Sequence, residues 1–223
     1  MPTIFGQGLL PGSHGAAARA MAGGMMSPAG ARNQSLVAEM GPAYRRPRAA
    51  MARQLAAGLS EGRALFHLGL ACILLCVASV PSALERAASI DADDPVNAAI
   101  AAQIFGFIVL LPMIAYGLAA LMRGVSRLIG GSGSGLAMRS ALFWSMLLAA
   151  PIALLLAAFG SLARSGVEGV ASVSVWIGYV ALGYWFWLLA AAVAESERFR
   201  TRSVFLVFCL LFGLVAVALR GAL

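Results

Sequence analysis

Five apolar stretches, each near or above the length that crosses a lipid bilayer, constrain this chain more than any other feature. They cover about residues 64–82, 97–122, 140–162, 171–194 and 203–219. A helix needs roughly 20 mainly apolar residues to span the hydrocarbon core, where backbone polar groups must be paired within the protein. The stretches show no alternation of apolar and polar residues that would indicate strands. The sequence therefore predicts an all-α protein, a polytopic membrane bundle of five transmembrane helices.

The composition agrees with a chain whose main solvent is lipid. Hydrophobic residues make up 61% and charged residues 11% of the 223, and the mean hydropathy is +0.88. Soluble domains average about 25% charged residues. We expect three regions: residues 1–40, 41–63 and the membrane domain 64–219.

Residues 1–40 are rich in Gly, Ala and Ser and contain no acid before Glu39. They lack the continuous apolar core of a secretory signal and a convincing amphipathic face of a transit peptide. We predict that this segment is disordered, or that translation starts later, at Met26 or Met40.

Residues 41–63 contain Met51, Leu55 and Leu59 at four-residue spacing, with arginines beside them. This pattern is typical of a short amphipathic helix in the cytoplasmic interface, its apolar stripe in the acyl boundary. An ordinary juxtamembrane linker fits equally well. Ser60 is expected to cap the first transmembrane helix.

Arginine distribution predicts the orientation. Between residues 41 and 202, eleven arginines lie just before helix one or in the connections from helix two to three and four to five, whereas only Arg86, Arg164 and Arg220 lie on the other side. Positive charge favours the cytoplasm, so the N-terminus is expected inside and the C-terminus outside. The acidic segment "DADDP" (91–95) then lies outside, as a solvated turn that starts a helix.

A net charge of +7 is a feature that many nucleic-acid-binding proteins share, but no nucleic-acid motif accompanies it here. The arginines flank membrane segments, where each gains about 1 kcal/mol from anionic headgroups. We therefore expect anionic lipids of the cytoplasmic leaflet as partners, with a protein partner or homo-oligomer also possible. The candidate contact residues are Arg45, Arg46, Arg48, Arg53, Arg123, Arg127 and Arg139.

The stretch "RGVSRLIGGSGSGLAMRSALFW" (123–144) resembles a phosphate-binding loop at first sight. A Walker-type loop needs Lys followed by Ser or Thr, and the chain contains no lysine. A dinucleotide fingerprint starting at Gly131 and Gly133 would need glycine where Leu136 stands. The stretch is therefore interpreted as a flexible cytoplasmic turn, held at the headgroups by its arginines.

The five apolar stretches contain no central Asp, Glu, Lys or Arg, which counts against an ion-coupled transporter. His67, Cys72 and Cys76 are better explained by packing than as copper ligands. Ser132 and Ser134 have no histidine placed to act as a base. We predict no catalytic residue, metal or cofactor, and hence a protein that is not an enzyme.

Pro112 and Pro151 lie inside the second and third apolar stretches and are expected to kink these helices. A small transporter or permease subunit is the alternative that these kinks leave open. Its path would run between helices two and three, lined by Asn97, Gln103 and Tyr116.

Several segments together resemble the Yip-domain family, the Ypt/Rab-interacting type of membrane protein, in a bacterial form. They are "YRRPRAAMARQL", "VPSALERA", "FGFIVLLPMIAYGLAALMRGVSRLIGGSGSG" and "RSALFWSMLLAAPIALLLAAF", within about residues 43–219. The resemblance implies a five-helix membrane protein with a cytoplasmic N-terminal segment and no catalytic residue. Eukaryotic members are associated with Rab-type GTPases, but the lysine-free, arginine- and alanine-rich composition is typical of a high-GC bacterial genome, and the long acidic and aromatic cytoplasmic domain of those members is missing, so we do not carry that role over. The missing intramembrane charges favour a scaffold or adaptor over the permease, and we expect it in a bacterial inner membrane.

Overall fold

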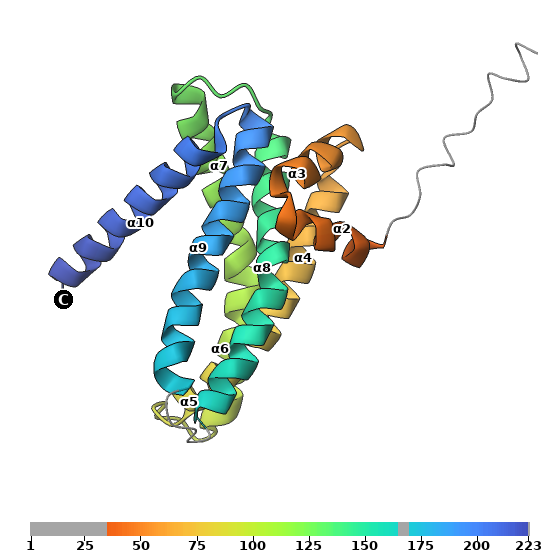
Figure 1. Ribbon diagram of the computed structural model, residues 1–223. Coiled ribbons are helices and arrows are strands. Elements are labelled where there is room, and N and C mark those ends of the chain that lie inside the picture. The colour runs from red at the N-terminus through yellow and green to blue at the C-terminus, as the bar shows by residue number, and fades with distance from the viewer. Residues whose placement is uncertain (1–34, 165–169, 223) are drawn as a thin grey trace, which may run out of the picture. The chain divides into compact units, whose positions relative to one another are not determined.

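The computed structural model describes residues 35–164 and 170–222, and every regular element within them is a helix (Figure 1). The elements are α2 (Leu36–Arg45), α3 (Pro47–Ala56), α4 (Glu61–Ala78), α5 (Val80–Ala87), α6 (Pro95–Phe105), the π-helical turn η2 (Gly106–Leu110), α7 (Leu111–Leu128), α8 (Gly135–Arg164), α9 (Val170–Glu197) and α10 (Thr201–Ala222). The all-α fold class predicted from the sequence is confirmed for these residues.

Four candidate membrane spans are present among the described residues: Glu61–Ala78, Pro95–Leu128, Gly135–Arg164 and Val173–Glu197. They correspond to the first four apolar stretches and make the chain an integral membrane protein. The fifth predicted span falls in α10, of which Thr201–Leu210 is identified as a shorter apolar helix. The fifth crossing therefore stays a prediction.

Polar residues mark three ends of the first two spans. The predicted span 64–82 stops earlier, at Ala78, where the Ser79 hydroxyl bonds the carbonyls of Leu75 and Cys76 and the short α5 follows. Ser60 caps α4 as predicted, accepting from the Arg63 amide at 3.2 Å. Asp94 caps α6 in the same way, which confirms the "DADDP" segment as a helix-starting turn.

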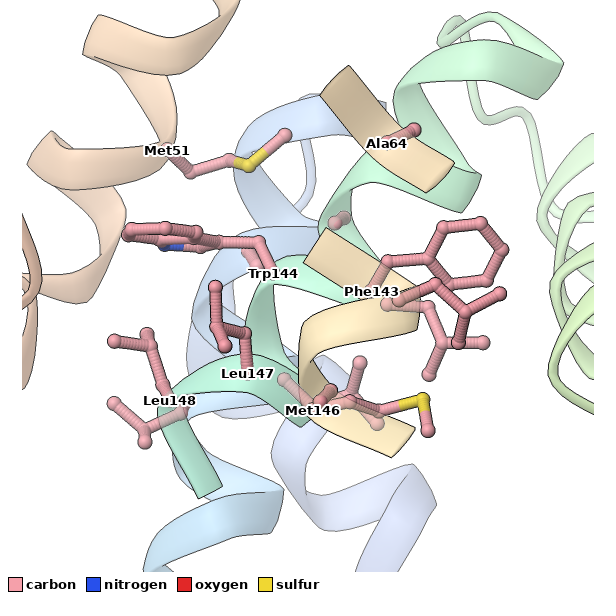
Figure 2. Close-up of a cluster of buried hydrophobic side chains, with 14 of the residues drawn as sticks. Met51, Ala64, Phe143, Trp144, Met146, Leu147 and Leu148 are labelled. Carbon is pink, nitrogen blue, oxygen red and sulfur yellow. The ribbon is translucent and has the colours of Figure 1, made fainter. Parts of the chain in front are cut away.

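Helix α8 forms the centre of the bundle and packs against α4, α7 and α9. Its residues 140–148 are all buried, and they are large and apolar except for Ala141 and two serines. Figure 2 shows Trp144, Leu147 and Leu148 of α8 in one cluster with Met51 of α3. The core therefore lies near the end of the bundle at which α8 begins.

Helices α2 and α3 form a short helical pair that packs on α8 and α9. Met51 has no exposed surface, and Leu36 and Met40 of α2 pack against the same core. Of the predicted apolar stripe, Met51 is covered by the bundle, and Leu55 packs partly buried against the same core. Contact of residues 41–63 with the acyl boundary stays a prediction. The chain is helical from Leu36, so the last residues of the predicted segment 1–40 are helical. Residues 1–34 lie outside the described part, and the predicted disorder or later start stays a prediction.

The two prolines differ in their surroundings. Pro112 is the second residue after η2, whose C-cap residue Leu111 donates its amide to the Gly106 carbonyl. A π turn leaves room for a proline, which lacks the N–H that a regular helix would use. Pro151 lies inside α8, which continues as one helix to Arg164. A kink at either proline stays a prediction.

Candidate functional site at the arginine-rich end

One end of the bundle is connected by ion pairs between segments far apart in the chain. Arg139 at the start of α8 pairs with Glu61 at the start of α4, and Arg48 of α3 pairs with Glu195 of α9 at 2.6 Å. At the same end Arg123 of α7 pairs with Glu197 at the end of α9 at 2.8 Å. We call this the arginine-rich end. The loops and helix ends that carry most of the arginines therefore belong to one packed surface.

Glu197 is the most unusual side chain of this end, because its carboxylate has no exposed surface. Its Oε2 accepts from the Arg123 guanidinium and, at 2.9 Å, from the backbone amide of Gly133. A buried charge is tolerated only when it is paired and hydrogen-bonded, and Oε2 meets that condition. The second oxygen, Oε1, is buried without a hydrogen-bond partner in the described part of the chain.

The glycine-serine loop between α7 and α8 encloses this carboxylate. Gly130 has φ +87°, which a side chain would disfavour, and the Gly131 amide bonds the Ser126 carbonyl at 2.7 Å. A Cβ at Gly131 would lie 2.5 Å from Glu197 Oε2, and one at Gly133 would lie 2.8 Å from Glu197 Cδ and in contact with the Ser196 carbonyl. The loop is therefore a packed cradle for Glu197 rather than the flexible turn that its composition indicated.

Helix α9 ends in the same way as α7, with a residue of positive φ followed by an amide that bonds a carbonyl five residues earlier. Arg198 has φ +62°, and the Phe199 amide bonds the Ala194 carbonyl at 2.8 Å, across five residues. A left-handed conformation costs a residue other than glycine on the order of 1 kcal/mol or more. The cost is offset by contacts that place Glu197 in the cradle and direct Arg198 outward, where it is exposed.

Two tyrosines attach α2 to the spans. The Tyr44 hydroxyl donates to the Leu148 carbonyl at 2.7 Å, and the Tyr184 hydroxyl of α9 donates to the Tyr44 carbonyl at 2.6 Å. Their rings stack with centroids 6.5 Å apart. Burial, and secondarily the Tyr184 phenol, raise the pKa of Tyr44, so it remains a neutral donor at physiological pH.

The seven arginines predicted to contact lipid or a partner fall into two groups. Arg48, Arg123 and Arg139 form the ion pairs given above, and Arg139 also lies over the Tyr116 ring, 5.9 Å from its centroid. Arg45, Arg46, Arg53 and Arg127 are exposed. Lipid or partner contact by any of the seven stays a prediction.

Eight exposed arginines at this end have no acid within ion-pair distance in the described part of the chain. Four of them are the exposed arginines named above, and the other four lie at the start of α4 and around the α9–α10 corner. The eight are Arg45, Arg46, Arg53, Arg63, Arg127, Arg198, Arg200 and Arg202. The four acids of this end are already occupied, Glu39 by a 2.8 Å hydrogen bond from Gln54 and the others by the three ion pairs. The result is a surface with unbalanced positive charge.

The residues proposed to line a permease path are placed in different environments. Asn97 is exposed and bonds the capping Asp94 at 2.6 Å. Gln103 lines a groove that includes neither Asn97 nor Tyr116, and the Tyr116 ring packs against Phe143, 5.1 Å away. Within the described residues, no three His, Cys, Asp or Glu side chains gather as a metal site would require.

Sequence reasoning missed Glu195 and Glu197 as partners. Both lie in "AESERFR", a helix end that was noted only for its arginines. A signal was present, because two acids at the boundary of an otherwise uncharged helix need cations nearby. The arginines that pair with them are far away in the sequence: Arg123 lies 74 residues from Glu197, and Arg48 lies 147 residues from Glu195. Only the packing of the helices shows which arginines these are.

Long apolar helices capped at one end by a basic, ion-paired surface define an integral membrane protein with several spans. The sequence model of the Yip1 domain matches residues 43–220, and the chain therefore belongs to the Yip1 domain family. This confirms the resemblance inferred from the sequence motifs. No curated protein and no solved structure matches the chain significantly.

Proposed function

We propose that this Yip1 domain protein is a non-enzymatic membrane scaffold or adaptor, located in a bacterial inner membrane with its arginine-rich end in the cytoplasm. The observation that carries the proposal is the set of eight exposed arginines without acid partners. Anionic headgroups of the cytoplasmic leaflet bind the arginines nearest the membrane. The arginines of α2, α3 and the α9–α10 corner hold an acidic protein partner.

The ion pairs support this function by keeping the surface in one arrangement. Arg48 and Arg123 connect α3 and α7 to the end of α9, so that exposed arginines from four segments of the chain are presented together. A prearranged charged surface binds with less loss of side-chain and loop entropy than a flexible one. It also accelerates association with an acidic partner at low salt.

The test is purification from native membranes in mild detergent with a C-terminal tag. We expect a stoichiometric acidic protein to co-purify with the wild type and to dissociate as salt is raised. The variant Arg45→Gln/Arg46→Gln/Arg53→Gln should lose the partner, because it removes three positive charges from the proposed binding surface. Its fold should stay intact, because none of these three side chains forms an ion pair in the described part of the chain. The control Arg164→Gln, at the other end of α8, should retain it. A triple variant that keeps the partner contradicts the adaptor function, and a wild-type preparation that holds only a small molecule favours the permease alternative.

A further inference from the structure

The end of the bundle opposite to the arginine-rich end contains a groove between the α5 segment and α6. Its volume is about 380 Å³, within the range typical of small-ligand sites. The groove is lined by Arg86, Ser89 and Ile90 on one side and by Ala102, Gln103 and Phe107 on the other. One guanidinium and one amide thus lie among mainly apolar residues, a combination that suits an amphiphilic ligand.

Arg86 is held in place without being neutralised. Its Nη2 donates to Gln103 Oε1 at 3.2 Å, and Gln103 Nε2 donates to the Cys76 carbonyl at 3.0 Å. The neighbouring Glu85 is occupied by Arg164, 2.6 Å away, and no acid in the described residues pairs with Arg86. A guanidinium carries five N–H donors, so most remain available to a ligand.

The position of Gln103 along its helix places Arg86 near the phosphate level of the membrane. Nineteen residues, 104–122, separate Gln103 from Arg123 and contain no charge. At about 1.5 Å per residue they cover roughly 28 Å, close to the thickness of the hydrocarbon core. With Arg123 at one boundary, Gln103 and the Arg86 guanidinium lie at the other. Phe107 then faces the first part of the acyl region.

The charges around the groove are of both signs. Ile90 is followed directly by Asp91 and then Asp93, which are exposed and form no ion pair in the described part of the chain. Asp94 caps α6. The Ser89 hydroxyl donates to the Arg86 carbonyl at 2.8 Å, so the guanidinium alone supplies strong donors to an anion. The arginine thus lies at the depth of the lipid phosphates, and the acids lie further from the centre of the membrane. This order suits a headgroup whose phosphate lies closer to the membrane centre than its ammonium group.

We propose that this groove binds a zwitterionic phospholipid. The phosphate contacts Arg86, the ammonium contacts the carboxylates of Asp91 and Asp93, and the first part of one acyl chain lies over Phe107. A purely anionic headgroup is disfavoured because it would place its charge beside those two acids. This site is independent of the arginine-rich end and of the adaptor function.

The experiment measures retained lipid by native mass spectrometry, after purification in mild detergent and incubation with equal amounts of phosphatidylethanolamine and phosphatidylglycerol. We expect the wild type to retain phosphatidylethanolamine. Arg86→Gln should lower its affinity about tenfold, the effect of losing one charge-assisted phosphate contact. The double variant Glu85→Gln/Arg164→Gln is the matched control, because it removes an arginine from the same end of the bundle outside the groove and leaves no freed acid beside Arg86.

Two further variants keep the proposal falsifiable. Ala102→Trp fills the groove and leaves Arg86 in place, so it should abolish retention without changing charge. Asp91→Asn/Asp93→Asn should shift the preference toward phosphatidylglycerol. Thermal unfolding of each variant shows whether the fold is intact. Wild type that retains phosphatidylglycerol by preference or no lipid, or a folded Arg86→Gln variant that retains phosphatidylethanolamine as well as wild type, overturns the proposal.

Discussion

The carboxylate of Glu197 shows how a single residue can determine the structure of a loop. With its side chain fully buried, it depends on the Arg123 guanidinium and on the Gly133 amide. Removing one partner of a buried ion pair typically costs about 3–5 kcal/mol, and the partial exposure of Arg123 places this pair toward the lower value. The glycines are required for a steric reason, because any Cβ at position 131 or 133 would meet Glu197.

Gly133→Ala should therefore destabilise the protein, whereas Gly135→Ala should not. The added methyl of Gly133→Ala meets Glu197 and the Ser196 carbonyl, and the required shifts cost about 1–3 kcal/mol. A Cβ at Gly135 would meet nothing within 4 Å, and this glycine begins α8, so alanine there is neutral or stabilises the helix by up to about 1 kcal/mol. The measurement is the unfolding midpoint in detergent, followed by tryptophan fluorescence. Equal midpoints for the two variants would show that the loop does not hold Glu197.

At the scale of elements, the α2–α3 pair is the part of the molecule that most changes the expected architecture. It packs on α8 and α9 through Met51 and the two tyrosines, and brings its arginines to the ends of the spans. Arg48 adds the pair with Glu195, but its side chain is 49% exposed, and such surface pairs contribute little stability. Apolar burial, with Met51 as the largest fully buried side chain of α3, therefore contributes more to holding α3 than this pair does.

Replacing Met51 with aspartate should release α3, while the same replacement at Ala49 should not. A carboxylate at position 51 would replace a fully buried apolar side chain and lose its hydration, a cost of several kcal/mol, whereas Ala49 is exposed. Limited trypsin digestion in detergent measures the release through cleavage after Arg53, a bond that neither substitution directly adjoins. We expect cleavage of Met51→Asp to be faster by about tenfold or more, and Ala49→Asp to match wild type. Similar rates for both variants would contradict docking through Met51.

The helices were predictable because apolar runs of bilayer length leave little choice of secondary structure. The predicted stretch 140–162 lies within α8 and 171–194 within α9, and the differences are polar turns at helix ends. The site was less predictable for a physical reason. The exposed arginines of the arginine-rich end could be located from sequence, but the partners of Arg48 and Arg123 depend on how α3 and α7 pack against α9. Similarly, the apolar stripe of α3 has the same pattern whether lipid or protein covers it.

At the scale of the whole molecule, charge separates the two ends of the bundle. The arginine-rich end has eleven arginines and four acids, whereas the end with α5 and the α5–α6 turn has Arg86 and Arg164 against four acids within the described residues. From the positive-inside rule we expect the bundle to be oriented with α2 and α3 in the cytoplasm. The same asymmetry separates the two proposed sites, with anionic lipid or an acidic partner at one end and a zwitterionic headgroup at the other.

The path of α10 decides whether the C-terminus shares the side of the arginine-rich end. Helix α10 starts at that end, and its 22 residues cover roughly 33 Å, enough to cross the hydrocarbon core. In a background without Cys72, Cys76 and Cys209, a membrane-impermeant maleimide should label Ala92→Cys in intact cells and Ala57→Cys only after permeabilisation. A cysteine added after Leu223 should behave like Ala92→Cys, because a fifth crossing places it outside. If it behaves like Ala57→Cys, α10 lies along the membrane surface and the bundle has four crossings; if Ala57→Cys is labelled in intact cells, the orientation itself is reversed.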